Sequence, residues 1–189
     1  MKDIKLFLTD VDGCMTDGGM YYTEKGDEFK RFCVYDGMGI VLMRKAGIPC
    51  GILTSENTNI GLQRGEKLGL EYIYTGVGRV VDGVKMTKLD AANKICAELG
   101  ITLENVCFVG DDVNDLDLLQ HVGMAACPAN AVAEVKAVPG IIHLTKQGGD
   151  GAIREVAEMI LKAKSEHPGC PVLIHPECPP QTLALADYA

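Results

Sequence analysis

The chain has 189 residues, of which 47% are hydrophobic and 23% charged, and its formal net charge is −8. This length and composition are typical of one globular domain with a real core, and the acidic balance argues against nucleic acid as a partner, because duplex-binding proteins usually present a basic face. No apolar run approaches the roughly 20 residues of a membrane span, and charges interrupt the apolar start of the chain. We therefore expect a cytoplasmic protein that neither crosses a membrane nor carries a signal peptide.

Apolar runs and helical patterns alternate along the chain. Strands are expected at 4–9, 48–53, 72–74, 106–109, 124–126 and 141–144, and helices at 37–46, 58–68, 87–99, 116–121, 131–136 and 150–164. Two β-type runs around a glycine-containing turn within residues 16–34 predict a hairpin. The alternation predicts an α/β fold of three layers, in which helices cover both faces of a parallel sheet.

Three of the expected strands end in polar side chains. The pairs are Asp10 with Asp12, Thr54 with Ser55, and Asp111 with Asp112. Because ligands bind beyond the carboxyl ends of the strands in such sheets, we expect these side chains to converge on one site.

The spacing of Asp10 and Asp12 places two carboxylates in a tight loop, where they can perform nucleophilic and acid/base chemistry on a phosphate ester. One carboxylate can attack phosphorus, and the other can protonate the leaving oxygen and then activate water. Carboxylates gathered in this way require a cation, and an all-oxygen site suits Mg²⁺. Thr54 can donate a hydrogen bond to a phosphoryl oxygen, and Lys88, at the start of an expected helix, can supply positive charge.

Each of these pieces is ordinary when it occurs alone. An isolated Asp-x-Asp is frequent by chance, and a Gly-Asp-Asp is most often a turn. The hypothesis of a phosphate-ester site depends on their occurring together. Acidic loops follow two different apolar strands, and a threonine and a lysine lie between these loops in the chain.

These motifs resemble those of the haloacid dehalogenase superfamily of phosphohydrolases. The matching segments are Leu-Thr-Asp-Val-Asp-Gly at 8–13, Ile-Leu-Thr-Ser at 52–55, Lys88, and Val-Gly-Asp-Asp-Val-Asn-Asp at 109–115. The resemblance spans residues 1–164, which we take as the domain. It implies a Rossmann-like fold, Asp10 as nucleophile, Asp12 as acid/base, and phosphate binding by Thr54, Ser55 and Lys88. It also implies Mg²⁺ held by Asp10, the Asp12 carbonyl and Asp111, with Asp112 and Asp115 in support.

Within that superfamily the chain is similar to a small branch without a separate cap domain. The shared features are the hairpin that begins with Asp-Gly-Gly-Met-Tyr-Tyr, and the segments at 35–40, 126–131 and 148–155. This branch includes phosphatases of 3-deoxy-octulosonate 8-phosphate and of nonulosonate (sialic-acid-type) 9-phosphates. The resemblance implies a hairpin flap and a homotetramer in which a neighbouring subunit covers the active site.

Substrate choice depends on the residues after Thr54. Glu56, Arg64 and Lys67 match the nonulosonate pattern, and cationic side chains could pair with a sugar-acid carboxylate. The expected substrate is therefore a nonulosonate 9-phosphate, with octulosonate 8-phosphate as the alternative. In another interpretation these residues form a solvated helical face. A departure from the family pattern is Ser55, where glycine is usual, and another is an insertion at 78–83 before Lys88.

A catalytically silent domain that serves in assembly is the competing hypothesis of another class. The presence of Asp10, Asp12, Thr54, Lys88 and Asp111 argues against it.

The segment 165–189 is rich in proline, histidine and cysteine and is expected to be an extension rather than a domain. Residues 172–189 resemble a fragment of quinolinate synthase, but a single matching cysteine, Cys178, does not make an iron–sulfur site. The spacing of the histidines and cysteines in this segment fits no standard zinc finger.

The cysteines of the preceding domain occur singly in apolar stretches, which predicts buried reduced thiols. These are Cys14, Cys33, Cys50, Cys96, Cys107 and Cys127.

Overall fold

The structure, a computed structural model, describes residues 3–81 and 83–166. Within these ranges, six parallel strands form the main sheet in the order β10-β9-β8-β1-β4-β5. Their bounds are Ile142–His143 for β10, Met124–Cys127 for β9, Val106–Val109 for β8, Leu6–Thr9 for β1, Cys50–Leu53 for β4 and Tyr72–Tyr74 for β5. The first strand lies in the middle, and the chain continues to β4 on one side and later to β8 on the other. Such a switch point opens a crevice beyond the strand ends where ligands bind.

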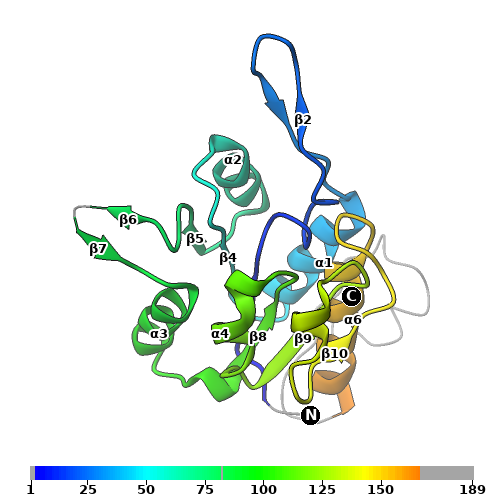
Figure 1. Ribbon diagram of the computed structural model, residues 1–189. Helices are drawn as coiled ribbons and strands as arrows, with labels where there is room; N and C mark the ends of the chain where they lie inside the picture. The colour runs from blue at the N-terminus through cyan, green and yellow to red at the C-terminus, as the bar shows by residue number, and fades with distance from the viewer. Residues whose placement is uncertain (1–2, 82, 167–189) are drawn as a thin grey trace.

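Helices cover both faces of the sheet (Figure 1). Helices α1 (Val34–Lys45) and α6 (Ala152–Glu166) pack on one face, which α2 (Asn59–Leu68) also adjoins. Helices α3 (Lys88–Leu99), α4 (Leu116–Leu119) and α5 (Ala133–Lys136) pack on the other. Short 3-10 turns, η1 (Leu103–Asn105) and η2 (Val113–Asp115), precede β8 and α4. The expected three-layer α/β fold is therefore confirmed.

Strand β1 explains why the sheet is buried on both sides. Phe7 belongs to the cluster under α1 and α6, whereas Leu6 and Leu8 belong to the cluster under α3, α4 and α5. All three side chains are fully buried. Burial of each contributes about 1.5–3 kcal/mol to stability, so this central strand fixes the position of the residue that follows it, Asp10.

Helix α1 begins three residues earlier than expected, at Val34 rather than at residue 37. Glycines weaken a helix, and α1 contains two of them, Gly37 and Gly39. Here tertiary packing requires them: a Cβ at Gly39 would lie 3.0 Å from the Cα of Arg154 in α6, and one at Gly37 would lie 2.6 Å from the guanidinium of Arg64. Close approach of the neighbouring helices therefore outweighs the low helix propensity.

Two β-hairpins extend from this body (Figure 1). The expected hairpin pairs β2 (Tyr21–Tyr22) with β3 (Glu28–Phe29), and a bridge between Thr16 and Phe32 closes its base. The insertion at 78–83, expected only to lengthen a loop, belongs to a second hairpin of β6 (Val80–Val81) and β7 (Val84–Lys85). Within the described ranges, the insertions between the strands and helices of the sheet are these hairpins, and none is a separate cap domain.

Helix α6 continues to Glu166, two residues past the expected domain end at 164, and the C-terminal extension from 167 onward lies outside the described residues.

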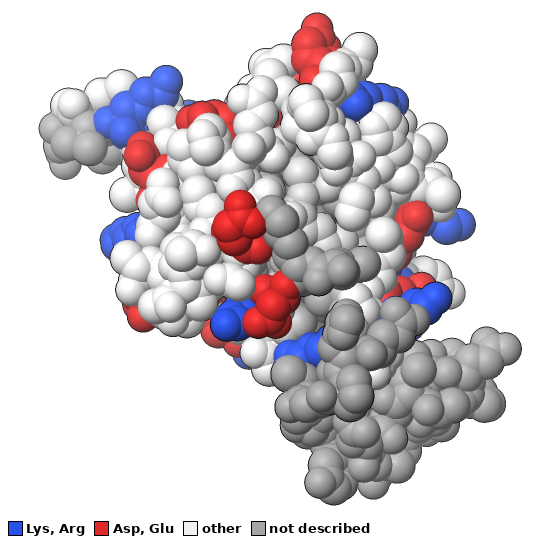
Figure 2. Space-filling model, turned by 90° about the horizontal axis from the view of Figure 1, so that it is seen from below, with Lys and Arg blue, Asp and Glu red and all other residues white. Residues whose placement is uncertain are grey.

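The expectation of unpaired cysteines is confirmed for the six in the described part, of which all but the half-buried Cys33 are buried. No helix among the described residues is long and apolar enough to cross a membrane. Figure 2 shows the face seen from below the view of Figure 1, where charged side chains occur in small groups of both signs between uncharged ones.

Candidate active site

The ends of β1, β4 and β8 come together, as the sequence predicted, around a cavity of about 240 Å³. The cavity is lined by side chains from the loops that follow these three strands. They include Asp10, Asp12, Thr54, Ser55, Glu56, Asp111, Asp112 and Asn114. Asp10, Asp12, Thr54, Ser55 and Asp111 therefore share one space, although about a hundred positions separate Asp10 from Asp111 in the chain, whereas Lys88 is not among the lining residues.

Asp10 lies directly after β1 and is 5% exposed. Its main-chain N–H donates to the carbonyl of Val109 in β8 at 2.9 Å, and its Oδ1 accepts from the N–H of Val11 at 2.7 Å. Burial raises the pKa of Asp10 to about 7, against the opposing charge of Lys88. The carboxyl group is thus fixed in direction and held in a poorly solvated place, as a nucleophile should be.

Lys88, the first residue of α3, reaches between two carboxylates. Its Nζ lies 3.1 Å from Oδ2 of Asp10 and donates to Oδ1 of Asp115 at 2.5 Å. Burial alone would lower the pKa of Lys88, but the charges of Asp10 and Asp115 raise it above its usual value, so the lysine stays cationic. The capping box of Thr87 and Asp90 fixes the start of α3 and hence the origin of the lysine side chain.

Asp115 orients the loop after β8. Its Oδ2 accepts from the main-chain N–H of Asp111 at 3.0 Å and from that of Asp112 at 3.3 Å, and its side chain is fully buried. The side chain of Asp112 caps η2 by accepting from Val113 at 2.7 Å. Asp115 therefore holds the backbone from which Asp111 projects.

Asp111 lies against the loop after β1. A Cβ at Gly13, which has a φ of +79°, would stand 1.9 Å from Oδ2 of Asp111. Glycine is therefore needed here both for its backbone conformation and for the space. Burial, together with the nearby charge of Asp115, raises the pKa of Asp111 to about 7.

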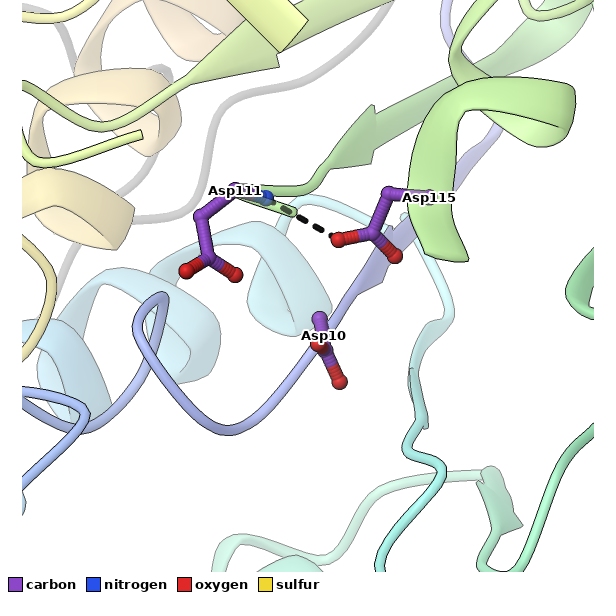
Figure 3. Close-up of side chains that lie close together, drawn as sticks. All are labelled: Asp10, Asp111 and Asp115. Carbon is purple, nitrogen blue, oxygen red and sulfur yellow. Dashed lines mark hydrogen bonds between the residues drawn. The ribbon is translucent and has the colours of Figure 1, made fainter. Parts of the chain in front are cut away.

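Asp10, Asp111 and Asp115 each offer an oxygen within 4.8 Å of the others, a set that could hold a metal ion (Figure 3). Two of these carboxyl groups have a raised pKa because burial opposes their negative charge. A divalent cation would favour their ionised forms, and oxygen donors of this kind suit Mg²⁺. The carboxylates therefore fit a magnesium ion, and the carbonyl of Asp12 was expected as a further ligand.

Asp12 turns toward the first hairpin. Its Oδ1 and Oδ2 accept from Nζ of Lys30 at 2.8 Å and 2.7 Å, and Thr16 donates to Oδ1 at 3.3 Å. The Lys30 side chain is 1% exposed. Because Lys30 directly follows β3, the hairpin contributes a buried cation to the site and fixes the carboxylate that is expected to act as acid and base.

Comparisons with known proteins agree with this geometry. The sequence profile of the haloacid dehalogenase-like hydrolases matches residues 83–155. The chain is 32% identical over 166 residues, covering 88% of itself and 87% of the relative, to 3-deoxy-D-manno-octulosonate 8-phosphate phosphatase KdsC of Haemophilus influenzae. The chain belongs to the haloacid dehalogenase-like hydrolases.

Solved structures of this hydrolase family show the same fold. The phosphatase of that name from Moraxella catarrhalis, in complex with magnesium, phosphate and KDO, is 36% identical with a TM-score of 0.78, over 86% of this chain and 88% of that one. The cobalt-bound form of the Haemophilus influenzae enzyme is 32% identical with a TM-score of 0.77, over 88% and 94%. The chain is thus a phosphoric monoester hydrolase of this family, and the expected magnesium cofactor agrees with these relatives and with its own carboxylates.

Two further hydrogen bonds in this hydrolase involve the loop after β4, and the second of them joins it to η2. Thr54, 3% exposed, accepts from the N–H of Glu56 at 3.1 Å, and Asn114 donates to the hydroxyl of Ser55 at 3.1 Å. Thr54 and Ser55 both line the cavity that Asp10 also lines.

The residues expected to choose the substrate separate in the structure. Glu56 lines the cavity. Arg64 instead stacks over Phe32, its guanidinium carbon 5.3 Å from the ring centroid, and Lys67 is exposed on α2. Neither Arg64 nor Lys67 lines the catalytic cavity of its own chain.

Three side chains of the hydrolase that position the site were not found from the sequence. Lys30 and Asn114 are described above. The third, Asn130, donates to the carbonyl of Gly13 at 2.9 Å and accepts from the N–H of Gly148 at 2.7 Å, so it joins the loop of Asp12 to the loop before α6. The segments that contain Asn130 and Gly148 stood out as family-like, but nothing in them pointed to a contact with residue 13.

Proposed function

We propose that this phosphatase hydrolyses 3-deoxy-D-manno-octulosonate 8-phosphate, with Mg²⁺ as its cofactor. The observation that carries the proposal is the cluster of the Asp10, Asp111 and Asp115 carboxylates, with Lys88 between Asp10 and Asp115, in a chain whose relatives bear the name of that activity. A nonulosonate 9-phosphate was our first expectation for the substrate. That assignment has less support, because the matched relatives carry the octulosonate name.

In the proposed reaction, Asp10 attacks phosphorus and the bond between phosphorus and the sugar oxygen breaks. Asp12 donates a proton to the departing oxygen, so that the sugar leaves as an alcohol. Asp12 then takes a proton from water, whose oxygen attacks the phosphorus of the aspartyl phosphate. The bond to Asp10 breaks, inorganic phosphate leaves, and both carboxyl groups return to their starting states.

The surrounding residues would position and stabilise the phosphoryl group. Thr54 and Ser55 would donate hydrogen bonds to its oxygens, and Lys88 would supply positive charge beside Asp10. Asp10, Asp111 and the carbonyl of Asp12 would hold the magnesium ion, which neutralises phosphoryl charge. Asp112 and Asp115 would support that site through the loop after β8.

The direct test measures kcat/KM for octulosonate 8-phosphate, a nonulosonate 9-phosphate and a simple hexose 6-phosphate, with Mg²⁺ and with excess chelator. We expect turnover that needs Mg²⁺ and a kcat/KM highest for octulosonate 8-phosphate. A higher kcat/KM for the nonulosonate would overturn the substrate assignment, and the absence of Mg²⁺-dependent turnover on all three would overturn the proposed function.

A homotetramer in which a neighbour covers the site is part of the same proposal. Large apolar side chains are exposed on the first hairpin and at the start of α1, at Met20, Tyr21, Tyr22, Phe29, Val34, Tyr35 and Met38. These exposed apolar side chains lie on two segments that follow each other in the chain, which favours an interface with another protein, and Lys30 directly follows the hairpin strand β3. A second copy of the chain would bury this surface next to the active site.

Light scattering of the purified full chain tests the assembly. We expect a tetramer for the wild type and smaller species for Tyr22→Ser combined with Phe29→Ser. A monomeric wild type that retains full activity would overturn this part of the proposal. A matched change at Leu62, an exposed residue of α2, should leave the oligomeric state unchanged.

A further inference from the structure

A second cavity of about 360 Å³ adjoins the catalytic one. Ser55, Glu56 and Asn114 line both cavities, and the hydrogen bond from Asn114 to Ser55 lies at their boundary. Sites for small molecules usually occupy about 300–1,000 Å³. The catalytic cavity, at about 240 Å³, is therefore small for a phosphorylated eight-carbon sugar acid, and its neighbour offers the additional space.

The two cavities differ in the charges that line them. The catalytic cavity is lined by Asp10, Asp12, Asp111, Asp112 and Glu56, and its described lining contains no lysine or arginine. The second cavity is lined by three cationic residues and two acidic ones. These are Arg79, Lys85 and Lys88, with Glu56 and Asp117.

Two of the three cations come from the second hairpin. Arg79 immediately precedes β6, and Lys85 ends β7. Lys88 is already engaged by Asp10 and Asp115, so the positive charge available to a ligand in this cavity comes from Arg79 and Lys85. The insertion thus brings cationic side chains next to the phosphate-binding loop.

Arg79 is held in place at this boundary. Its Nε donates to the carbonyl of Ser55 at 2.9 Å, and its terminal nitrogen lies 3.8 Å from Oε1 of Glu56. One of the five N–H groups of the guanidinium is therefore used to fix its orientation. Because the pair with Glu56 is long and its side chains are 54% and 42% exposed, it is weak, and a ligand carboxylate could displace it.

We propose that the second cavity binds the carboxylate of the sugar acid, with Arg79 as the main contact and Lys85 as a weaker one. This rests on the proposed function, since it assigns the carboxylate end of that substrate. With its phosphoryl group at Asp10, the sugar chain would pass the Ser55–Asn114 boundary and place its carboxylate on the fork of donors that arginine presents to such groups. Arg79 is then a specificity-determining residue for the reaction.

The test compares octulosonate 8-phosphate with a pentose 5-phosphate that lacks the carboxylate. In Arg79→Gln, a side-chain amide can still donate to Ser55, so the loop contact is retained while the charge is lost. We expect kcat/KM for the sugar-acid phosphate to fall about tenfold to a hundredfold, mainly through KM, and that for the pentose phosphate to fall by less than about threefold. Arg79→Lys should recover part of the loss, and Lys85→Gln should lose less than Arg79→Gln.

Lys45→Ala is the matched control, since it removes one exposed positive charge at the end of α1, away from the cavity. Its kcat/KM values should equal those of the wild type. An equal loss on both substrates in Arg79→Gln would show that the arginine only supports the loop, and no loss on either would show that it does not contact substrate. Each result would overturn the proposal.

Failure of the proposed function would appear differently, as a wild type that does not hydrolyse the sugar-acid phosphate. In that case free 3-deoxy-octulosonate is used as an inhibitor of pentose phosphate hydrolysis. We expect inhibition that weakens about tenfold in Arg79→Gln. Inhibition that is unchanged by the substitution, or absent in the wild type, would overturn the carboxylate site.

Discussion

The two adjoining cavities are built in different ways. The catalytic cavity is formed by loops that directly follow β1, β4 and β8, so the buried sheet fixes its geometry. The second cavity takes its cationic wall from the β6–β7 hairpin, which extends from the body (Figure 1). The chemistry and the proposed recognition of the substrate are thus carried by separate parts of the chain, and substitutions should affect them separately.

The largest effect is expected from Asp10→Asn. The amide keeps the size of the side chain but removes the nucleophile, so kcat should fall by about three orders of magnitude or more on every phosphate ester. The measurement is phosphate release by purified protein, with thermal unfolding as the check on folding. Asp3→Asn, which changes an exposed carboxylate, should retain full activity. Retained turnover in Asp10→Asn would contradict the assignment of the nucleophile.

The next effect tests the contact between the two acidic loops. In Gly13→Ala, the new Cβ would overlap the carboxylate of Asp111, so Mg²⁺ affinity and activity should fall about a hundredfold or more. Gly47→Ala imposes similar strain, at a φ of +74° with open space around the Cβ, and should cost about 1–2 kcal/mol of stability without affecting Mg²⁺ binding. Calorimetric titration measures the Mg²⁺ affinity of both variants. Equal affinities in Gly13→Ala and Gly47→Ala would refute the contact between Gly13 and Asp111.

A smaller effect is expected from Lys30→Met, which removes both Nζ hydrogen bonds to Asp12. A less well oriented acid/base should lower kcat about tenfold to a hundredfold while KM changes by less than about threefold. The matched control is Lys25→Met at the exposed turn of the same hairpin, for which steady-state kinetics should match the wild type. If kcat in Lys30→Met is also unchanged, Lys30 does not position Asp12.

The last expected effect is graded rather than abrupt, and it is the pH dependence of Mg²⁺ affinity. Asp10 and Asp111 have their pKa raised to about 7 by burial, so in the metal-free protein they hold protons below that pH. Magnesium binds their ionised forms and displaces these protons, so its affinity should fall as pH falls below about 7, about tenfold per pH unit for each proton released. Mg²⁺ titrations of Asp111→Asn at several pH values should show an affinity that depends less steeply on pH. A wild-type Mg²⁺ affinity that does not change with pH would contradict the shifted pKa values.

The catalytic cavity could be predicted from the sequence because its residues follow strands that apolar runs reveal. Asp10, Thr54 and Asp111 each end such a run, and parallel topology alone brings them to one edge. Lys30 could not be predicted, because its contact with Asp12 depends on how the hairpin folds back, which no local pattern encodes. The same holds for Arg79, since a short insertion looks like a longer loop until its strands are seen to pair.

The glycines of α1 and α2 show how tertiary contacts override helix propensity. Gly37 and Gly39 of α1 are required by the close approach of neighbouring side chains and helices. Gly65 in α2 is similar, since a Cβ there would lie 2.8 Å from Ile73. In each case tertiary contact, which is not visible locally, outweighs the propensity on which a sequence-based prediction depends.

The most direct test of the central claim is to trap the phosphorylated enzyme. Wild-type protein is mixed with Mg²⁺ and octulosonate 8-phosphate, quenched rapidly in acid, digested and mapped by mass spectrometry. We predict one phosphoryl group on Asp10, removable by neutral hydroxylamine as an acyl phosphate is, and absent from Asp10→Asn. Turnover accompanied by a phosphoryl group on another residue would contradict the account.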